Sequence, residues 1–263
     1  MKKITILLVM FAFLASFAVA QNIGLEVGAE LGMDNITEGN DKDSTFIAAP
    51  TLIYANTFDA LDVWARLRFR LWFVEDNFTM TPYLELNAGY SIPLGPGTLR
   101  IGLWDELLIT IPEEGDNVTW GYIEPTVRYS YTADFGTIHA QPSVGIEHLT
   151  DFDSQIDVNF QVGYFNPIGF GINAKMYLNV SNGVEEMKEI RFLPYYVNGP
   201  IYAEVDVRIG NPGSGLGDSY IICPYFSYQI TSQLRAWAWV WITGAEADDD
   251  VQMWPTIGAA WKF

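Results

Sequence analysis

Seven aromatic residues recur along the chain at intervals of 32 to 41 residues, namely Tyr54, Tyr90, Tyr131, Tyr164, Tyr196, Tyr228 and Trp261. Each lies near the end of a segment in which apolar and polar residues alternate, and each falls on the apolar face. Amphipathic rings held at one depth are typical of a membrane–water interface. Alternating strands that carry such a belt predict a transmembrane β-barrel.

The alternation is clearest in the segment from residue 22 to residue 33. One face carries Ile23, Leu25, Val27, Ala29 and Leu31, and the other carries Gly24, Glu26, Gly28, Glu30 and Gly32. A shift in pairing by one residue would exchange the two faces, so the register is well specified. The same period predicts thirteen more strands, at 46–55, 62–73, 79–92, 98–109, 121–131, 137–148, 156–165, 171–180, 188–197, 201–209, 220–230, 233–243 and 251–263. We therefore expect an all-β fold, a transmembrane antiparallel up-and-down barrel of about fourteen strands, with twelve as the alternative count.

A secreted soluble β-sandwich or barrel, with the apolar face as its core, is the other interpretation of this periodicity. A closed barrel of fourteen strands is too wide for side chains to fill, which argues against an apolar interior. Strands of about ten residues, tilted by about 40°, span about 25 Å, which is the height of the outer-membrane apolar band. Both arguments favour the membrane barrel.

The first twenty residues predict a secretory signal peptide. Lys2 and Lys3 precede an almost wholly apolar run from residue 4 to residue 20, and Ala18-Val19-Ala20 has the small-x-small form of a cleavage site. The alternative, an N-terminal membrane anchor, is less favoured because the run is short for a spanning helix. We expect an exported chain with a barrel from 21 to 263. The first strand follows the cleavage site directly, so no plug domain is expected.

The connections between the expected strands alternate in length. The longer ones are 34–45, 74–78, 112–118, 149–155, 181–187, 210–218 and 244–250, and the shorter ones are 56–61, 93–97, 132–136, 166–169, 198–200 and 231–232. All seven belt aromatics lie at the end with the shorter turns, which is periplasmic in bacterial barrels. The longer connections hold most of the acidic residues, while Lys42 and Lys188 are among their few bases.

Seven prolines fall inside the expected strands on the apolar face: Pro50, Pro82, Pro125, Pro142, Pro194, Pro224 and Pro255. Proline removes a backbone donor and normally avoids central strands. Their recurrence in six of the seven descending strands predicts duplicated hairpins that each tolerate a β-bulge.

The net charge of −18 excludes nucleic acid as a partner, because its binders need a basic face. The polar faces of the strands carry a nearly balanced mixture of charges instead. If these faces line a lumen, the candidate channel-lining residues are Glu26, Glu30, Arg66, Arg68, Arg70, Glu85, Arg100, Glu106, Glu124, Arg128, Glu147, Lys175, Arg191, Glu204 and Arg208.

Two features of the polar faces bear on transport. Arg66, Arg68 and Arg70 form a ladder on one strand, which either polarises passing solutes or is neutralised by acids such as Glu85. Tryptophans also share the polar-face parity: Trp64, Trp72, Trp104, Trp237, Trp239, Trp241 and Trp254. They could stack on sugar rings in the lumen, although 233–243 is apolar on both faces and its tryptophans could instead face lipid. We favour the lumen.

The last strand, 251–263, ends in Phe263 and has apolar residues at alternate positions before it. This pattern resembles the C-terminal signature of bacterial outer-membrane proteins, in which the terminal aromatic residue is an assembly signal. The resemblance implies the outer membrane of a diderm bacterium as location, and outer-membrane lipids, the barrel-assembly machinery and periplasmic chaperones as partners. By strand number and the lack of added domains, the chain looks most like the monomeric fourteen-stranded porins of the OmpG type.

The expected function is passive diffusion of small hydrophilic solutes or ions, without enzymatic activity or a cofactor. The alternative is a non-transporting surface barrel that acts in adhesion or binds cations through its acidic loops. A rim protease is a remote third interpretation, based on His148 beside Asp151 and Asp153. No metal site is expected: Cys223 is the only cysteine, and residues 40–44 lack the glycine and the distal glutamate of an EF-hand loop.

Overall fold

The computed structural model describes residues 25–33, 46–74, 77–111, 116–150, 154–181, 186–211, 215–245 and 248–263. The predicted signal peptide lies outside these ranges. The strands are β1 (Leu25–Met33), β2 (Phe46–Phe58), β3 (Leu61–Val74), β4 (Asn77–Leu94), β5 (Gly97–Thr110), β6 (Val118–Ala133), β7 (Gly136–Leu149), β8 (Gln155–Phe165), β9 (Phe170–Asn179), β10 (Glu186–Asn198), β11 (Ile201–Asn211), β12 (Gly215–Gln229), β13 (Leu234–Ala245) and β14 (Asp248–Lys262).

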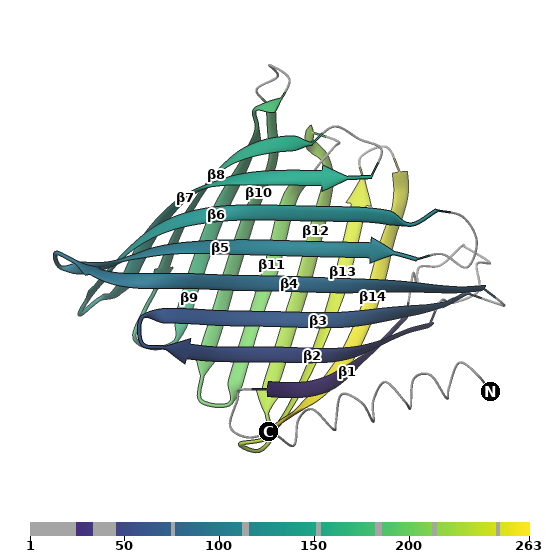
Figure 1. Ribbon diagram of the computed structural model, residues 1–263, viewed down its shortest axis with the longest axis horizontal. Helices are drawn as coiled ribbons and strands as arrows, with labels where there is room; N and C mark the ends of the chain where they lie inside the picture. The colour runs from purple at the N-terminus through teal and green to yellow at the C-terminus, as the bar shows by residue number, and fades with distance from the viewer. Residues whose placement is uncertain are drawn as a thin grey trace.

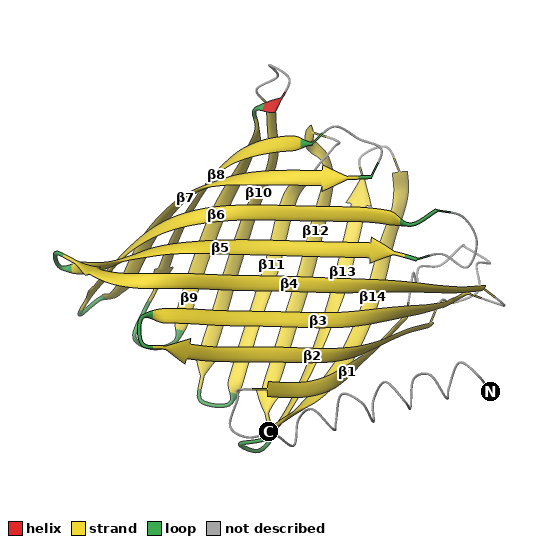
Figure 2. Ribbon diagram, in the orientation of Figure 1, coloured by secondary structure: helices red, strands yellow, loops and turns green. Residues whose placement is uncertain are grey.

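Each strand pairs antiparallel with its neighbours in sequence, and β1 closes the sheet by pairing with β14 (Figure 1). The predicted all-β up-and-down barrel is therefore confirmed, and so is the higher of the two strand counts. Nearly all of the described chain is strand (Figure 2). In the same part of the chain, no helix is long and apolar enough to cross a membrane.

The two faces of the sheet have opposite chemistry. On the outer face, Ile101 is 52% exposed and Val127, its neighbour on β6, is 44% exposed. On the inner face, Glu124 is only 3% exposed and Asn159 only 1%. A soluble protein buries its apolar side chains, so this inverted pattern requires an apolar solvent around the barrel. The soluble β-sandwich is thus excluded. The outer face does include one acidic residue, Asp105, which pairs with Leu86 and Ile123.

The belt aromatics share one level on this outer face. Tyr90 pairs with Leu61, the first residue of β3, and Tyr228 pairs with Ile201, the first residue of β11. The first residue of the preceding strand likewise pairs with four other belt aromatics, namely Tyr54, Tyr131, Tyr196 and Trp261. The seventh, Tyr164, pairs with the third residue of β7. The belt therefore lies at the end of the barrel where the short turns are. Its contact with a membrane interface stays a prediction.

The short turns join strands through two to four residues. The two-residue turns after β4 and β10 begin with Gly95 (φ +58°) and Gly199 (φ +55°). Tight hairpin turns need this left-handed conformation, which glycine adopts without steric cost. The C-terminus lies at the same end, because the Lys262 amide donates to the Gln233 carbonyl in the turn after β12 at 2.7 Å.

At the opposite end, the predicted contrast in connection length is partly wrong. Only residues 75–76, 212–214 and 246–247 separate the strands at three of these connections, so they are no longer than the short turns. Asp248, Asp249 and Asp250 accordingly belong to β14 and not to a loop. The reason is that a hairpin ladder is held by backbone hydrogen bonds, which continue beyond the apolar band whatever the side chains are.

The in-strand prolines do not produce the predicted bulges. Around Pro50, the β2–β3 pairs Ala48↔Leu71 and Thr51↔Arg68 keep the same register, and only the pairs between them are missing. On its other side, Pro50 pairs with Ala29 of β1 without interruption. The same in-register gap occurs beside Pro125, Pro142, Pro194 and Pro224. Proline loses one backbone donor, so it weakens the ladder toward one neighbour while the other neighbour fixes the register.

The orientation of the barrel can be tested by epitope insertion. An epitope tag inserted at Asn40, between β1 and β2, is expected to bind antibody on intact cells. A tag at Gly95, in the turn after β4, should bind only after the outer membrane is permeabilised, because short turns face the periplasm in bacterial barrels. The measurement is surface labelling before and after permeabilisation, with equal total labelling as the control. The reverse pattern would overturn the predicted orientation.

Candidate channel lumen

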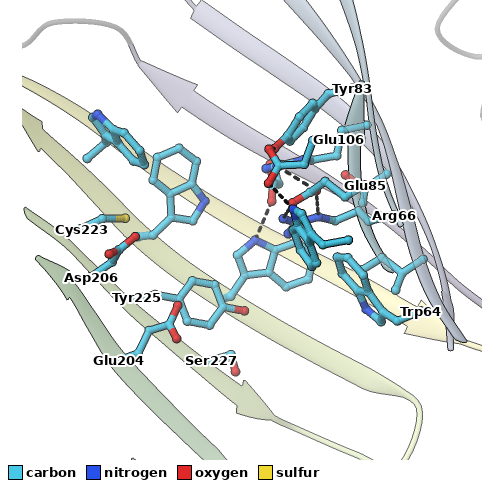
Figure 3. Close-up of a pocket in the computed structure, with 18 of the residues that line it drawn as sticks. Trp64, Arg66, Tyr83, Glu85, Glu106, Glu204, Asp206, Cys223, Tyr225 and Ser227 are labelled. Atoms are coloured by element: carbon cyan, nitrogen blue, oxygen red, sulfur yellow. Dashed lines mark hydrogen bonds and ion pairs between the residues drawn. The ribbon is translucent and has the colours of Figure 1, made fainter. Parts of the chain in front are cut away.

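The interior of the barrel contains a large cavity with a volume of about 1090 Å³. Figure 3 shows two walls of it: Trp64, Arg66, Tyr83, Glu85 and Glu106 come from β3, β4 and β5, and Glu204, Asp206, Cys223, Tyr225 and Ser227 come from β11 and β12. A smaller cavity of about 250 Å³ adjoins it and shares lining residues such as Trp104 and Tyr122. Polar strand faces thus enclose space inside the barrel.

The structure places the candidate channel-lining residues around these two cavities. The larger cavity is lined by Glu30, Arg66, Arg68, Arg70, Glu85, Glu106, Glu147, Arg191, Glu204 and Arg208, and the smaller one by Arg100, Glu106, Glu124, Arg128, Lys175 and Arg191. Glu26 lines neither, but its carboxylate accepts a hydrogen bond from Arg235, which lines the larger cavity. Whether these side chains border a conducting path stays a prediction.

The arginine ladder is partly neutralised. Arg66 binds Glu85 with two donors, Nε and Nη2, the latter at 2.6 Å. Arg68 donates to Glu85 at 3.1 Å and lies 3.6 Å from Glu30. Arg70 has no ion pair within the described part of the chain, and its guanidinium lies 5.0 Å from the centre of the Tyr83 ring. The ladder was predicted either to be neutralised by acids or to polarise passing solutes, and each prediction describes part of it. Arg66 and Arg68 are salt-bridged to acids, whereas Arg70 forms no ion pair with the described residues.

A second network joins four strands across β6, β7, β8 and β9. The Glu124 carboxylate accepts hydrogen bonds from Ser143 at 2.5 Å, Lys175 at 2.8 Å and Asn159 at 2.9 Å. Lys175 is itself buried and lies 4.4 Å from the centre of the Tyr177 ring. A buried charge needs such partners, because desolvation otherwise costs several kcal/mol.

The prediction that Lys188 belongs to an outer connection is wrong. Lys188 is only 4% exposed and bonds to Asp157 at 3.1 Å and Glu147 at 3.3 Å inside the barrel. The cause is a register shift between Met187 and Glu189, which turns two successive side chains inward. The bulge lies at the start of β10, so too few residues precede it for the change in alternation to be visible in the sequence.

A third network holds the opposite wall. Asp206 accepts from Arg191 at 2.5 and 2.7 Å and from Arg208 at 2.7 and 3.0 Å. Asp206, Asp157 and Arg235 are thus interior residues that were not chosen as candidates, although their inward parity was visible. The alternation shows which side chains point inward, but it does not show which charged residues on different strands form ion pairs.

Aromatic rings line the same walls. Trp237, Trp239 and Trp241 border the larger cavity, so β13 turns its tryptophans to the lumen, as favoured from the sequence. Trp64 stacks on Trp104 with ring centres 6.0 Å apart. Further along the wall, Phe165, Tyr195, Tyr202 and Tyr225 form a chain of ring contacts with centre distances of 5.8, 6.4 and 5.9 Å.

The residue behind the protease interpretation does not face the lumen. His148 is exposed and pairs with Gly121 on the outer-face register of β6 and β7. Asp151 and Asp153 lie outside the described residues. Within the described ranges, no group of three or more histidine, cysteine, aspartate or glutamate side chains is arranged to hold a metal ion.

No family model matches the sequence, and no curated protein matches it. Among solved structures, the chain is similar to the toluene transporter TodX of Pseudomonas putida, with 9% identity, a TM-score of 0.50, and coverage of 95% of this chain and 92% of that chain. Two others are an engineered porin variant from Rhodopseudomonas blastica (8% identity, TM-score 0.42, 91% and 99% coverage) and a loop-deletion variant of OmpT, an outer-membrane protein of Vibrio cholerae (14% identity, TM-score 0.47, 91% and 97% coverage).

At these identities the similarity concerns the fold alone. The fold that the resemblance implies is thereby confirmed, while the assembly signal at Phe263 and the closer likeness to OmpG-type porins stay predictions. The chain has the fold of the bacterial outer-membrane β-barrels, here closed by fourteen antiparallel strands.

Proposed function

We propose that the protein is an outer-membrane channel for the passive diffusion of small hydrophilic solutes or ions, and that it is not an enzyme. The observation that carries the proposal is the cavity of about 1090 Å³ between charged and aromatic walls. A barrel that only anchored a surface structure would gain stability from a filled, well-packed interior. Polar walls around open volume instead favour passage of hydrated solutes.

The wall chemistry also supports small hydrophilic cargo. Arg66, Glu85 and Asp206 are held in ion pairs on strands of the barrel, so the charged groups are fixed in position. Fixed charges of both signs offer hydrogen bonds to a hydrated solute along the wall. The alternative function, a non-transporting barrel that acts through its acidic outer residues, keeps the same fold and differs only in having a closed lumen.

Conductance in a planar lipid bilayer tests the proposal, and the chain offers its own probe. Cys223 is the only cysteine and lines the larger cavity. Purified protein is expected to form discrete conducting channels. Treatment with a bulky methanethiosulfonate reagent should then lower the current in a stepwise manner, because the added group occupies the lumen.

Cys223→Ser is the matched control. This variant should conduct like the parent and should not respond to the reagent. Absence of conductance in the parent would favour the non-transporting barrel. Conductance that the reagent leaves unchanged, despite complete modification measured by mass spectrometry, would show that the ions do not pass through this cavity.

A further inference from the structure

The arginine ladder of β3 is short of acceptors. Arg66, Arg68 and Arg70 share only two carboxylates, Glu30 and Glu85, in the ion pairs of the described residues. Both carboxylates are buried, and Glu30 also accepts the indole N–H of Trp237 at 3.1 Å. The Nε of Arg68 is buried and has no acceptor in the described part of the chain. The ladder therefore has one guanidinium more than its bound carboxylates can neutralise.

Another carboxylate of the larger cavity, Glu106, is held by neutral donors. Glu106 accepts from Tyr83 and from Trp104, each at 2.6 Å. The Tyr83 ring separates it from the ladder, since Arg68 and Arg70 both lie over that ring, at 4.8 and 5.0 Å from its centre. Arg70 thus lines the larger cavity without an ion pair to any carboxylate of the described residues. A guanidinium in this position is suited to bind a carboxylate with two parallel hydrogen bonds.

One tryptophan in the same cavity has no stacking partner among the described residues. Arg235 lies 5.3 Å from the centre of the Trp237 ring, and Arg208 lies 4.9 Å from that of Trp241. Between them on β13, Trp239 also lines the cavity, yet among the described residues no cation or aromatic ring stacks on it. An indole face that meets a cavity can stack on an aromatic ring or on the C–H face of a sugar.

Small residues lie on the strands between these two groups. The strands that separate β13 from β3 are β14, β1 and β2. Opposite Trp237 and Trp239, β14 carries Gly258 and Thr256, and β1 carries Gly32 opposite Thr256. On β2, Ala49 pairs with Glu30. Trp239 and Arg70 line the same cavity, together with Glu30 of β1 and Thr51 of β2, so the cavity extends from the tryptophans to the arginines.

We propose that the larger cavity contains a binding site for a small monocarboxylate with a cyclic body, in which Arg70 binds the carboxylate and Trp239 stacks on the ring. The site would make the channel selective for such solutes over neutral ones. This inference rests on the proposed channel function for its physiological meaning, although binding itself does not require conduction. The shared chemistry fits two sources, a sugar acid or an aromatic acid.

Binding can be measured on the purified full-length barrel in detergent by isothermal titration, at constant chloride and ionic strength. The probes are glucuronate, benzoate, glucose and acetate. We expect glucuronate or benzoate to bind at least about tenfold more tightly than glucose, which lacks the carboxylate, and acetate, which lacks the ring. Preference for glucuronate identifies a sugar-acid site, and preference for benzoate identifies an aromatic-acid site.

Two variants and a matched control decide the assignment. Arg70→Gln should weaken the preferred probe by about tenfold or more, and Trp239→Leu should weaken it while leaving acetate unchanged. Arg128→Gln removes an equal charge from the smaller cavity and should keep the affinity within about twofold. Within the described part of the chain, Arg128 bonds only to the neutral side chain of Gln141. Equal binding of all four probes, or equal loss in the Arg70 and Arg128 variants, would overturn the proposal.

Conductance measured on the same preparation separates the two hypotheses. Conducting channels without selective probe binding would refute the site and leave the channel function intact. Selective binding by a barrel that does not conduct would support the site and refute the channel function.

Discussion

Replacing Glu124 by alanine is expected to lower the free energy of unfolding of the barrel by about 3–5 kcal/mol. Glu124 is 3% exposed, and its carboxylate bonds to Lys175, Ser143 and Asn159. Without it, Lys175 would be buried with no carboxylate bonded to it among the described residues, and two neutral donors would lose their acceptor. The measurement is denaturant unfolding in lipid vesicles followed by tryptophan fluorescence, with linear extrapolation to zero denaturant.

Glu147→Ala is the matched control for this variant. It also removes an interior carboxylate that binds a lysine, but Lys188 keeps Asp157 at 3.1 Å. Trp120 also loses an acceptor, because its indole N–H donates to Glu147 at 2.7 Å, so the expected loss is about 1–2 kcal/mol. Equal losses in the two variants would mean that the counter-charge of Lys175 does not govern stability. Glu124→Gln, which keeps a hydrogen-bonding amide, should lie between the parent and the alanine variant.

The strands could be predicted from the sequence because successive side chains of a β-strand point alternately to the two faces of the sheet. In β1, glycine and glutamate alternate with apolar residues over the whole strand, and the structure follows that register. The ends were predicted less well. β4 extends from Asn77 to Leu94, beyond the predicted 79–92, because backbone pairing continues after the apolar pattern stops.

The ion-pair networks could not be predicted in the same way. Lys175 on β9 reaches Glu124 on β6, so the contact depends on the registers of three successive strand pairs and on the curvature of the wall. Lys188 depends on a bulge that the alternation does not reveal. By contrast, the lumen position of Trp237 follows from a neighbour: its indole lies over Gly258 of β14, where a Cβ atom would come within 2.3 Å. Glycine at that position is a signal that a closer comparison of paired strands could have used.

The in-strand prolines interrupt the hydrogen-bond ladder as predicted, but they do not cause the predicted β-bulges. Proline does interrupt the ladder, as the missing pairs beside Pro125 show. The predicted bulge assumed that an interrupted ladder must also change register. In a closed barrel each strand has two neighbours, and Leu103 of β5 still pairs with Pro125. The register is therefore fixed from the other side.

Replacing Arg66, Arg68 and Arg70 together by glutamine is expected to make the channel several-fold more selective for cations at low salt. Glu30 and Glu85 would lose the guanidinium groups that neutralise them. A unit charge about 10 Å from a passing ion contributes about 0.4 kcal/mol in water, so three charges change the energy by about 1 kcal/mol. Each 1.4 kcal/mol corresponds to a tenfold ratio. The measurement is the reversal potential under a salt gradient.

The acidic residues at the start of β14 provide the opposite variant. Replacing Asp248, Asp249 and Asp250 by asparagine removes negative charge from the end of the barrel opposite the short turns, so the cation preference of the parent should fall. Both effects should fade as the salt concentration rises, because the Debye length falls from about 30 Å at 0.01 M to about 3 Å at 1 M. Since the two variants change the charge in opposite directions, a general effect on folding or insertion cannot imitate the result. Identical reversal potentials in the parent and both variants would show that neither cluster borders the conducting path.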